Sequence, residues 1–291
     1  MSGRDQRTAY AFIAPMVLVV VAFVVLPVVG TFWLSLLREV TYLPSQFAGL
    51  SNFARLLRDP QFWQSLRFTA AFTSVCVPLE IGLGLVFALI LNERLPARSL
   101  LRAAVLVPWA VPTIVSARTW ELIYNYSYGL ANYIMMAFNP GSQPINWLGS
   151  PLSAFAALVI ADVWKTTPFV AIILLAGLQT IPEEVYEHAK VDGADLFQRF
   201  FKITLPLLKP ALAVALIFRT IDTVRIMDLI YVVTNGGPGG STTSLSLLGY
   251  KYFNEGDFGY GSAVAVVVFA VAFVLSISYL KVTGFGSFLD D

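Results

Sequence analysis

Apolar residues gather in six long runs along this chain, and shorter polar segments separate the runs. The runs cover about 10–36, 68–91, 103–124, 152–178, 211–233 and 262–282. Each is long enough for an α-helix to cross about 30 Å of hydrocarbon. The pattern therefore predicts an all-α, polytopic membrane protein with six transmembrane helices, built as a single transmembrane domain over 1–291.

Composition supports this class and argues against several others. Hydrophobic residues make up 57% of the chain and charged residues 13%, whereas a soluble domain is about half apolar and one quarter charged. The net charge of +1 and the lack of a basic tract argue against nucleic acid as a partner. One cysteine, Cys76, and one histidine, His188, cannot form an intrachain disulfide or a metal cluster by themselves. We therefore expect no metal and no cofactor in this chain, and membrane lipid around it.

Lysine and arginine residues predict the orientation. The first run follows Arg4 and Arg7 and is too long for a cleaved signal peptide, so we expect an uncut helix that Pro15 and Pro27 kink. With the amino terminus inside, the ten inner cations are Arg4, Arg7, Arg94, Arg98, Arg102, Lys190, Arg199, Lys202, Lys209 and Lys281, and the five outer ones are Arg38, Arg55, Arg58, Arg67 and Lys251. The inner excess predicts that both termini and the polar segment 183–210 lie in the cytoplasm.

This inner polar segment carries charges of both signs between two apolar runs. Pro182 suits the start of a short helix, and Gly193 suits its end because glycine adopts the left-handed conformation without strain. Asp195 can cap a second short helix that reaches about Ile203 and that Pro206 ends. The apolar residues of the two helices are Val185, Tyr186, Ala189, Phe197, Phe200 and Phe201. Two short amphipathic helices at a membrane face predict docking into a groove of another protein, with a solvated loop as the alternative.

Charged residues also occur inside the runs, where an ionisable group needs a partner or a water-filled path. The fifth run carries Arg219, Asp222, Arg225 and Asp228. Their three-residue spacing and alternating sign predict consecutive i,i+3 ion pairs along one helix. Two interpretations stay open: a self-neutralising ladder that pins the helix in the bundle, and a polar lining for a solute, for which Arg219 and Asp222 lie nearest to mid-span.

An acid, a base, a hydroxyl and an aromatic ring occur close together in the fourth run, as Asp162, Lys165, Thr166 and Phe169. Such a set can hold a sugar, because charged groups bond its hydroxyls and a ring covers its apolar face. An Asp162–Lys165 pair that only stabilises packing is an equal alternative. Pro168 interrupts the helical hydrogen bonding, and we expect a neighbouring threonine to satisfy the freed group.

Three other features of the apolar runs have structural consequences. Pro108 and Pro112 are four residues apart in the third run and predict a bent helix beside a cavity. Arg118 and Glu121 of the same run are spaced for an ion pair. Glu80, in the second run, needs a partner that the sequence does not identify.

The inner polar segment carries a motif with fixed spacing: Glu187-His188-Ala189, then Gly193, then Ile203, then Leu205-Pro206. This motif resembles the cytoplasmic EAA signature of binding-protein-dependent ABC importer permeases, although His188 stands where that family usually has alanine. The resemblance covers about 10–282. It implies that the segment is the coupling helix, which inserts into a cleft of the ATP-hydrolysing subunit. The residues implied in this contact are Glu187, Ala189, Gly193, Ile203 and Pro206.

The chain also resembles the maltose-type branch of that family. This resemblance implies a sugar site in the membrane, built from the spans that flank the coupling loop and from the bent third span. Asp162, Lys165, Thr166 and Phe169 fall on ligand positions of the branch, Trp109, Thr113, Asp222 and Thr223 fall near others, and Arg219 joins them as a mid-span charge.

We therefore expect a transmembrane permease subunit of an ATP-driven ABC importer in the bacterial plasma (inner) membrane, with a disaccharide such as trehalose or maltose as the favoured sugar. The implied partners are a second homologous permease, two ABC ATPase subunits and an extracytoplasmic solute-binding protein. We expect no catalysis by this chain, because the glycine-rich segment 235–240 lacks the strand, lysine and helix of a phosphate loop. ATP and Mg²⁺ then bind to the ATPase partners. The alternatives are an importer subunit for glycerol-3-phosphate or another small polar solute, and an ion-coupled secondary transporter that uses Asp162 and Asp222.

Overall fold

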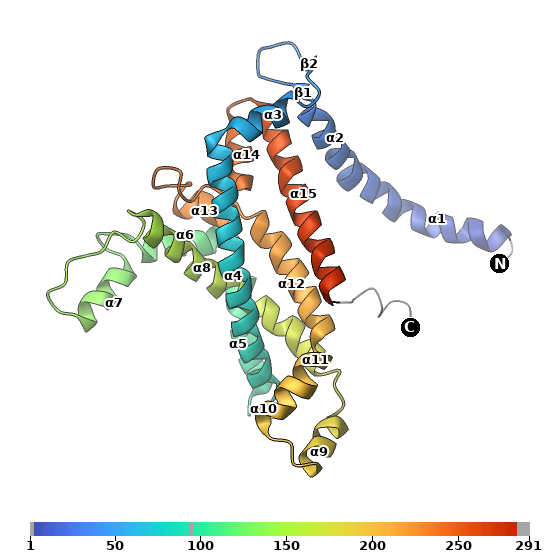
Figure 1. Ribbon diagram of the computed structural model, residues 1–291, viewed down its shortest axis with the longest axis vertical. Helices are drawn as coiled ribbons and strands as arrows, with labels where there is room; N and C mark the ends of the chain where they lie inside the picture. Colours follow the sequence, from blue (N-terminus) through green and yellow to red (C-terminus); the bar gives the residue numbers. More distant parts are fainter. Residues whose placement is uncertain (1–2, 94–95, 284–291) are drawn as a thin grey trace. The chain divides into compact units, whose positions relative to one another are not determined.

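Helices form most of the computed structural model, which describes residues 3–93 and 96–283 (Figure 1). The helices are α1 Gly3–Val20, α2 Leu26–Ser35, α3 Ser51–Arg58, α4 Pro60–Asn92, α5 Arg98–Ala110, α6 Thr113–Ile123, α7 Leu130–Phe138, α8 Pro151–Leu178, α9 Glu183–Val191, α10 Leu196–Arg199, α11 Leu205–Leu207, α12 Lys209–Val224, α13 Asp228–Val233, α14 Leu245–Asn254 and α15 Phe258–Thr283. Two π-helical turns, Val21–Val25 and Phe200–Thr204, and two short strands, β1 Leu37–Arg38 and β2 Gln46–Phe47, complete the described elements. Inner positions were predicted for Arg94 and for both termini. Arg94, residues 1–2 and residues 284–291 lie outside the described residues.

Six spans were predicted, and the described residues contain between four and six candidate spans. Four continuous helices are long and apolar enough to cross a membrane: Tyr10–Ser35, Pro60–Asn92, Pro151–Leu178 and Phe258–Lys281. Two bent helix pairs bring the number to six if each pair is one span: α5 and α6 meet at 85°, and the stretch Leu196–Leu207 meets α12 at 64°. The bend predicted from Pro108 and Pro112 is thereby confirmed. In the first span the irregular turn is the π-helical Val21–Val25, which ends two residues before Pro27.

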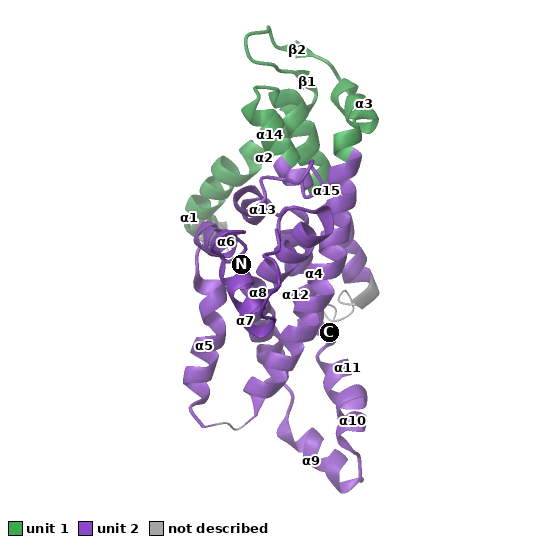
Figure 2. Ribbon diagram, turned by 90° about the vertical axis from the view of Figure 1, so that its left-hand side faces the viewer, with its two compact units in different colours: residues 1–62, 248–269 green, residues 63–247, 270–291 purple. Residues whose placement is uncertain are grey.

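The chain divides into two compact units, coloured separately in Figure 2: unit 1 is residues 1–62 and 248–269, and unit 2 is residues 63–247 and 270–291. In unit 1, β1 and β2 pair antiparallel. The buried side-chain amide of Asn52 donates to the carbonyls of Ser35 (2.9 Å) and Leu37 (2.7 Å), which attaches α3 to the end of the first span. Arg55 forms a 2.6 Å ion pair with Asp257.

Helix α8 is the centre of unit 2. In its most apolar stretch 67% of the residues are buried, against 33% in α4. Its side chains contribute to two apolar clusters. The first apolar cluster contains residues of α4, α6, α8, α13 and α14, and the second contains residues of α4, α8 and α12. Stacked Phe68 and Phe72 meet Phe155 edge-on in the first cluster. A helix so fully covered by protein is a rigid base for functional side chains.

The fifth span differs from its prediction, which ran to 233 as one helix. Helix α12 ends at Val224, Arg225 is its C-cap, and α13 begins separately at Asp228. The break lets α13 bury Leu229 and Ile230 in the first apolar cluster. The four charges therefore do not lie on a single helix, because burial of the apolar side of α13 outweighs continuation of α12.

The predicted inner helices are largely confirmed at one end of unit 2 (Figure 2). Helix α9 runs Glu183–Val191, and Gly193 has the positive φ of 77° that its role as a helix stop requires. Asp195 and Gln198 form a reciprocal capping box at α10. The prediction that Pro206 ends this helix is wrong. The π-helical turn Phe200–Thr204 shifts the hydrogen-bond register ahead of the proline, and helical structure continues to Leu207 before the 64° bend.

Candidate functional site

Three charged side chains from three spans meet inside unit 2. Arg219 of α12 reaches Glu80 of α4 with two bonds, Nε to Oε2 at 2.6 Å and Nη2 to Oε1 at 3.0 Å. Its Nη2 also lies 3.5 Å from Oδ2 of Asp162 on α8. All three residues are at least 94% buried. The partner of Glu80 that the sequence did not identify is therefore Arg219, which is 139 positions away.

Two threonines complete this buried cluster. The Thr166 hydroxyl lies 2.7 Å from both Glu80 Oε1 and the carbonyl oxygen of Asp162. The Thr223 hydroxyl accepts from Arg219 Nη2 at 3.2 Å and donates to the Arg219 carbonyl at 2.7 Å. A charged pair away from water is stable only when such bonds satisfy its remaining donors and acceptors. We call these five residues, Glu80, Asp162, Thr166, Arg219 and Thr223, the three-span cluster.

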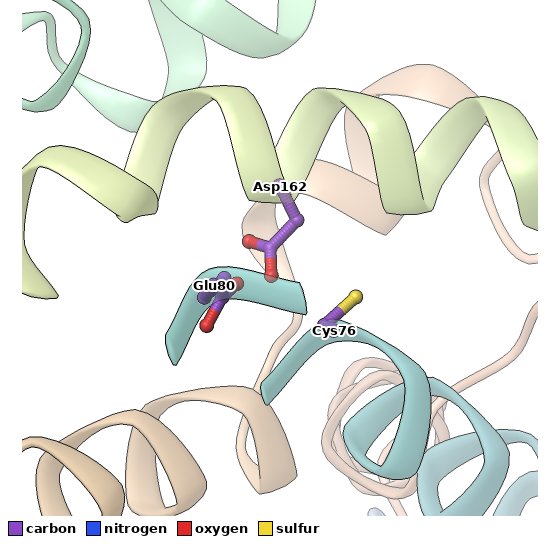
Figure 3. Close-up of side chains that lie close together, drawn as sticks. All are labelled: Cys76, Glu80 and Asp162. Atoms are coloured by element: carbon purple, nitrogen blue, oxygen red, sulfur yellow. The ribbon is translucent and has the colours of Figure 1, made fainter. Parts of the chain in front are cut away.

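The cluster also contains a set of possible metal ligands. Figure 3 shows Cys76 and Glu80 on α4 beside Asp162 on α8, and their ligand atoms lie within 4.8 Å of one another. The Arg219 guanidinium already occupies the space beside both carboxylates, at 2.6 Å from Glu80 and 3.5 Å from Asp162. A metal cation there would have to displace it against like-charge repulsion. The chemistry of the donor set therefore matches an internal ion pair, and the Cys76 thiol packs in the first apolar cluster.

Lys165 does not pair with Asp162, so that alternative for the fourth span is wrong. Its Nζ donates to the backbone carbonyls of Val111 at 2.7 Å and Trp109 at 3.4 Å. Asp162 faces Arg219 instead, because the two side chains leave α8 toward different neighbours. The predicted threonine bond to the carbonyl that Pro168 frees, that of Trp164, is absent among the described residues, because Thr166 bonds the Asp162 carbonyl instead.

Three aromatic side chains pack together on a more solvent-exposed side of α8. Trp109 stacks on Phe169 with ring centroids 5.7 Å apart, and Phe169 meets Phe218 of α12 edge-on at 6.1 Å. Trp109 is 49% exposed and Phe218 is 53% exposed. Asp222, one turn after Phe218, is also exposed. Exposed rings beside a carboxylate suit a polyhydroxylated ligand, because rings cover its CH faces and the carboxylate accepts hydroxyl hydrogens.

Two other predicted charge contacts can be checked. The pair Arg118–Glu121 is confirmed, at 2.6 Å. Asp222 lies 3.5 Å from Arg219 and 3.4 Å from Arg225, so the ladder forms over these three residues. Asp228 begins α13, beyond the break.

The nine predicted ligand residues thus separate by environment. Asp162, Thr166, Arg219 and Thr223 are buried and bond one another, Lys165 bonds the backbone of the bend, and Trp109, Phe169 and Asp222 are open to varying degree, with Thr113 half-buried at the start of α6. Contact of any of them with a ligand stays a prediction. Glu80 and Phe218 were missed; the only signal in the sequence for Glu80 was an isolated acid in an apolar run.

The end of unit 2 that α9 and α10 form presents exposed apolar side chains. Val191 is 87% exposed and Phe197 is 77% exposed, on α9 and α10 respectively. The Tyr186 hydroxyl lies 3.1 Å from that of Thr204, which connects α9 to the π-helical turn. Glu187 and Gly193 are exposed on the same end. Large apolar groups exposed on a tethered pair of short helices are typical of a surface that another protein covers.

Known proteins share this architecture and sequence. Residues 80–282 match the model of the family described as binding-protein-dependent transport system inner membrane component. The chain is 58% identical to the trehalose/maltose transport system permease protein MalF of Thermococcus litoralis, over 97% of this chain and 95% of that protein. It is 39% identical to the trehalose transport system permease protein SugA of Mycobacterium tuberculosis, over 96% and 90%. A bacterial ABC transporter involved in the import of the acidic polysaccharide alginate has the same fold, with a TM-score of 0.82, 22% identity and 96% of each chain covered.

Proposed function

The chain belongs to the family of binding-protein-dependent transport system inner membrane components, and on this premise we propose that it is the permease subunit of an ATP-driven importer that carries a sugar into the cytoplasm. The observation that carries the proposal is the 58% identity, over nearly the whole of both chains, to a trehalose/maltose permease. A disaccharide such as trehalose or maltose is the proposed cargo.

The sugar site follows from the division of the ligand residues. The proposed contacts are Trp109, Thr113, Phe169 and Asp222, whose rings and polar groups are the more accessible ones. Asp162, Thr166, Arg219 and Thr223 stand behind them as part of the three-span cluster. Their polar atoms bond one another, so their contribution is to hold α4, α8 and α12 together and thereby shape the site.

A neutral sugar fits this surface better than glycerol-3-phosphate. The Arg219 guanidinium is turned to Glu80 and Asp162, and the Lys165 ammonium is bonded to backbone carbonyls. An ion-coupled transporter is also less well supported, since Asp162, one of its two candidate acids, is held beside a guanidinium.

The inner end is the proposed contact with the ATPase. The residues proposed for this contact are Glu187, Ala189, Gly193, Ile203 and Pro206. The exposed apolar side chains beside them would become buried at the centre of the interface when the ATPase binds. The remaining partners are a second homologous permease, a second ATPase subunit and an extracytoplasmic solute-binding protein. The chain itself performs no catalysis, and ATP and Mg²⁺ bind to the ATPases.

This arrangement requires a plasma (inner) membrane location with both termini in the cytoplasm. The first span is unburied within the chain over its most apolar stretch. That surface is available to lipid and to the second permease. Closure of the ATPases on ATP then moves the inner end and alternates access to the sugar site.

Reconstitution tests the function directly. The chain is purified with its partner permease, ATPases and solute-binding protein, placed in liposomes, and supplied with trehalose, maltose or glycerol-3-phosphate. We expect ATP hydrolysis and uptake to rise with a disaccharide and the binding protein together. Uptake driven by an ion gradient without ATP, or stimulation by glycerol-3-phosphate alone, contradicts the proposal.

A further inference from the structure

The bend in the third span leaves backbone groups without helical partners. Helix α5 ends at Ala110, Val111 is extended with ψ of 130°, and α6 begins at Thr113 in a direction 85° away. Pro112 has no N–H to offer. The last carbonyls of any helix lack intrahelical donors, and in a membrane water does not replace them.

Lys165 supplies donors at this point from α8. Its Nζ lies 2.7 Å from the Val111 carbonyl oxygen and 3.4 Å from that of Trp109. In the part of the chain that the structure describes, no backbone N–H bonds either carbonyl outside regular helix bonding. The ammonium also places a positive charge at the negative end of the α5 dipole. Lys165 is thus a C-terminal cap supplied by a different helix.

The same turn of α8 also fixes the indole of Trp109. Phe169 is one helical turn after Lys165, and its ring stacks on that indole at 5.7 Å with the planes 19° apart. Helix α8 therefore contacts Trp109 at two points: Lys165 bonds the Trp109 backbone carbonyl, and Phe169 stacks on the Trp109 ring. A shift of the bend would change the position of the indole relative to Phe169.

From this geometry we propose that Lys165 is a positioning residue: it holds the bend of the third span and so sets the place of the Trp109 ring in the sugar site, without binding the sugar. The expected effect of Lys165 on sugar affinity rests on the proposed function. The backbone contacts themselves do not depend on that function.

Hydrogen–deuterium exchange of the assembled complex measures the first consequence. Lys165→Met removes the donors and keeps the length of the side chain, whereas Lys165→Arg keeps both charge and donors. With methionine we expect exchange over 109–116 to become about tenfold to a hundredfold faster, the factor for one lost charged hydrogen bond. Arginine should keep it slow. Arg118→Met is the matched control, since it removes a cation from the same bent span without touching the bend.

Uptake measurements separate positioning from binding. Lys165→Met should raise the half-saturating sugar concentration about tenfold. Weaker sugar affinity with unaltered exchange over 109–116 would make Lys165 a direct ligand and overturn the proposal. Unaltered exchange and unaltered affinity would overturn it as well. If the methionine variant does not assemble, Lys165→Gln replaces it, and exchange as slow as in Lys165→Arg then refutes the need for a charged donor.

The two proposals fail in distinguishable ways. If the wild-type complex imports no sugar, the proposed function is wrong, yet the exchange comparison still decides whether Lys165 holds the bend. If the wild type imports sugar and exchange does not respond to Lys165→Met, only the positioning role is wrong.

Discussion

Replacing Arg219 by methionine tests whether the three-span cluster holds the bundle together. The substitution leaves the carboxylates of Glu80 and Asp162 buried without a counter-charge. Two unit charges about 4 Å apart attract by about 4 kcal/mol at an effective dielectric constant of 20. Loss of one partner of a buried pair costs about 3–5 kcal/mol in measured cases. We therefore expect Arg219→Met to lower the free energy of unfolding by about 3–5 kcal/mol.

Denaturant titration of the purified subunit in mixed micelles measures this quantity. A double-mutant cycle with Glu80→Gln separates the pair from its surroundings, and the double variant should cost about 1–3 kcal/mol less than the sum of the two single changes. Arg225→Met is the control, because that side chain is 67% exposed and should change stability by no more than about 0.5 kcal/mol. Additive costs, or an Arg219→Met cost no larger than that of the control, would refute the assignment of the cluster as a structural unit.

Three other substitutions have definite expected outcomes. Glu187→Ala should reduce co-purification of the ATPase subunits about tenfold while the permease still inserts, and undiminished co-purification would count against the coupling role. Asp222→Asn should raise the half-saturating sugar concentration about tenfold without changing basal ATP hydrolysis; unchanged uptake kinetics would place the sugar elsewhere. Asn132→Ala removes four side-chain bonds, two to the carbonyls of Tyr126 and Ile145 and two from the Ile145 amide and the Trp147 indole. It should destabilise the loop between α6 and α8 by about 2–4 kcal/mol, seen as faster limited proteolysis there, and equal cleavage rates would contradict this.

Local patterns were enough to predict the long apolar helices and the start of each of the short helices α9 and α10. Long apolar runs have one physical solution in lipid, because a helix satisfies its own backbone groups. The start of α9, the stop at Gly193 and the cap at Asp195 follow from interactions within a few residues. The Arg118–Glu121 pair likewise lies within one helical turn. Each of these features depends on neighbours that the sequence itself places side by side.

The tertiary structure decided which charges meet. Asp162 and Lys165 are three residues apart, yet one turns to Arg219 and the other to the bend at Val111. Glu80 finds its counter-charge 139 residues away. Spacing along one helix shows which side chains are near each other, but how that helix is rotated against its neighbours depends on the packing of the whole bundle. For buried charges in this protein the partner lies across helices, and only the packed structure determines it.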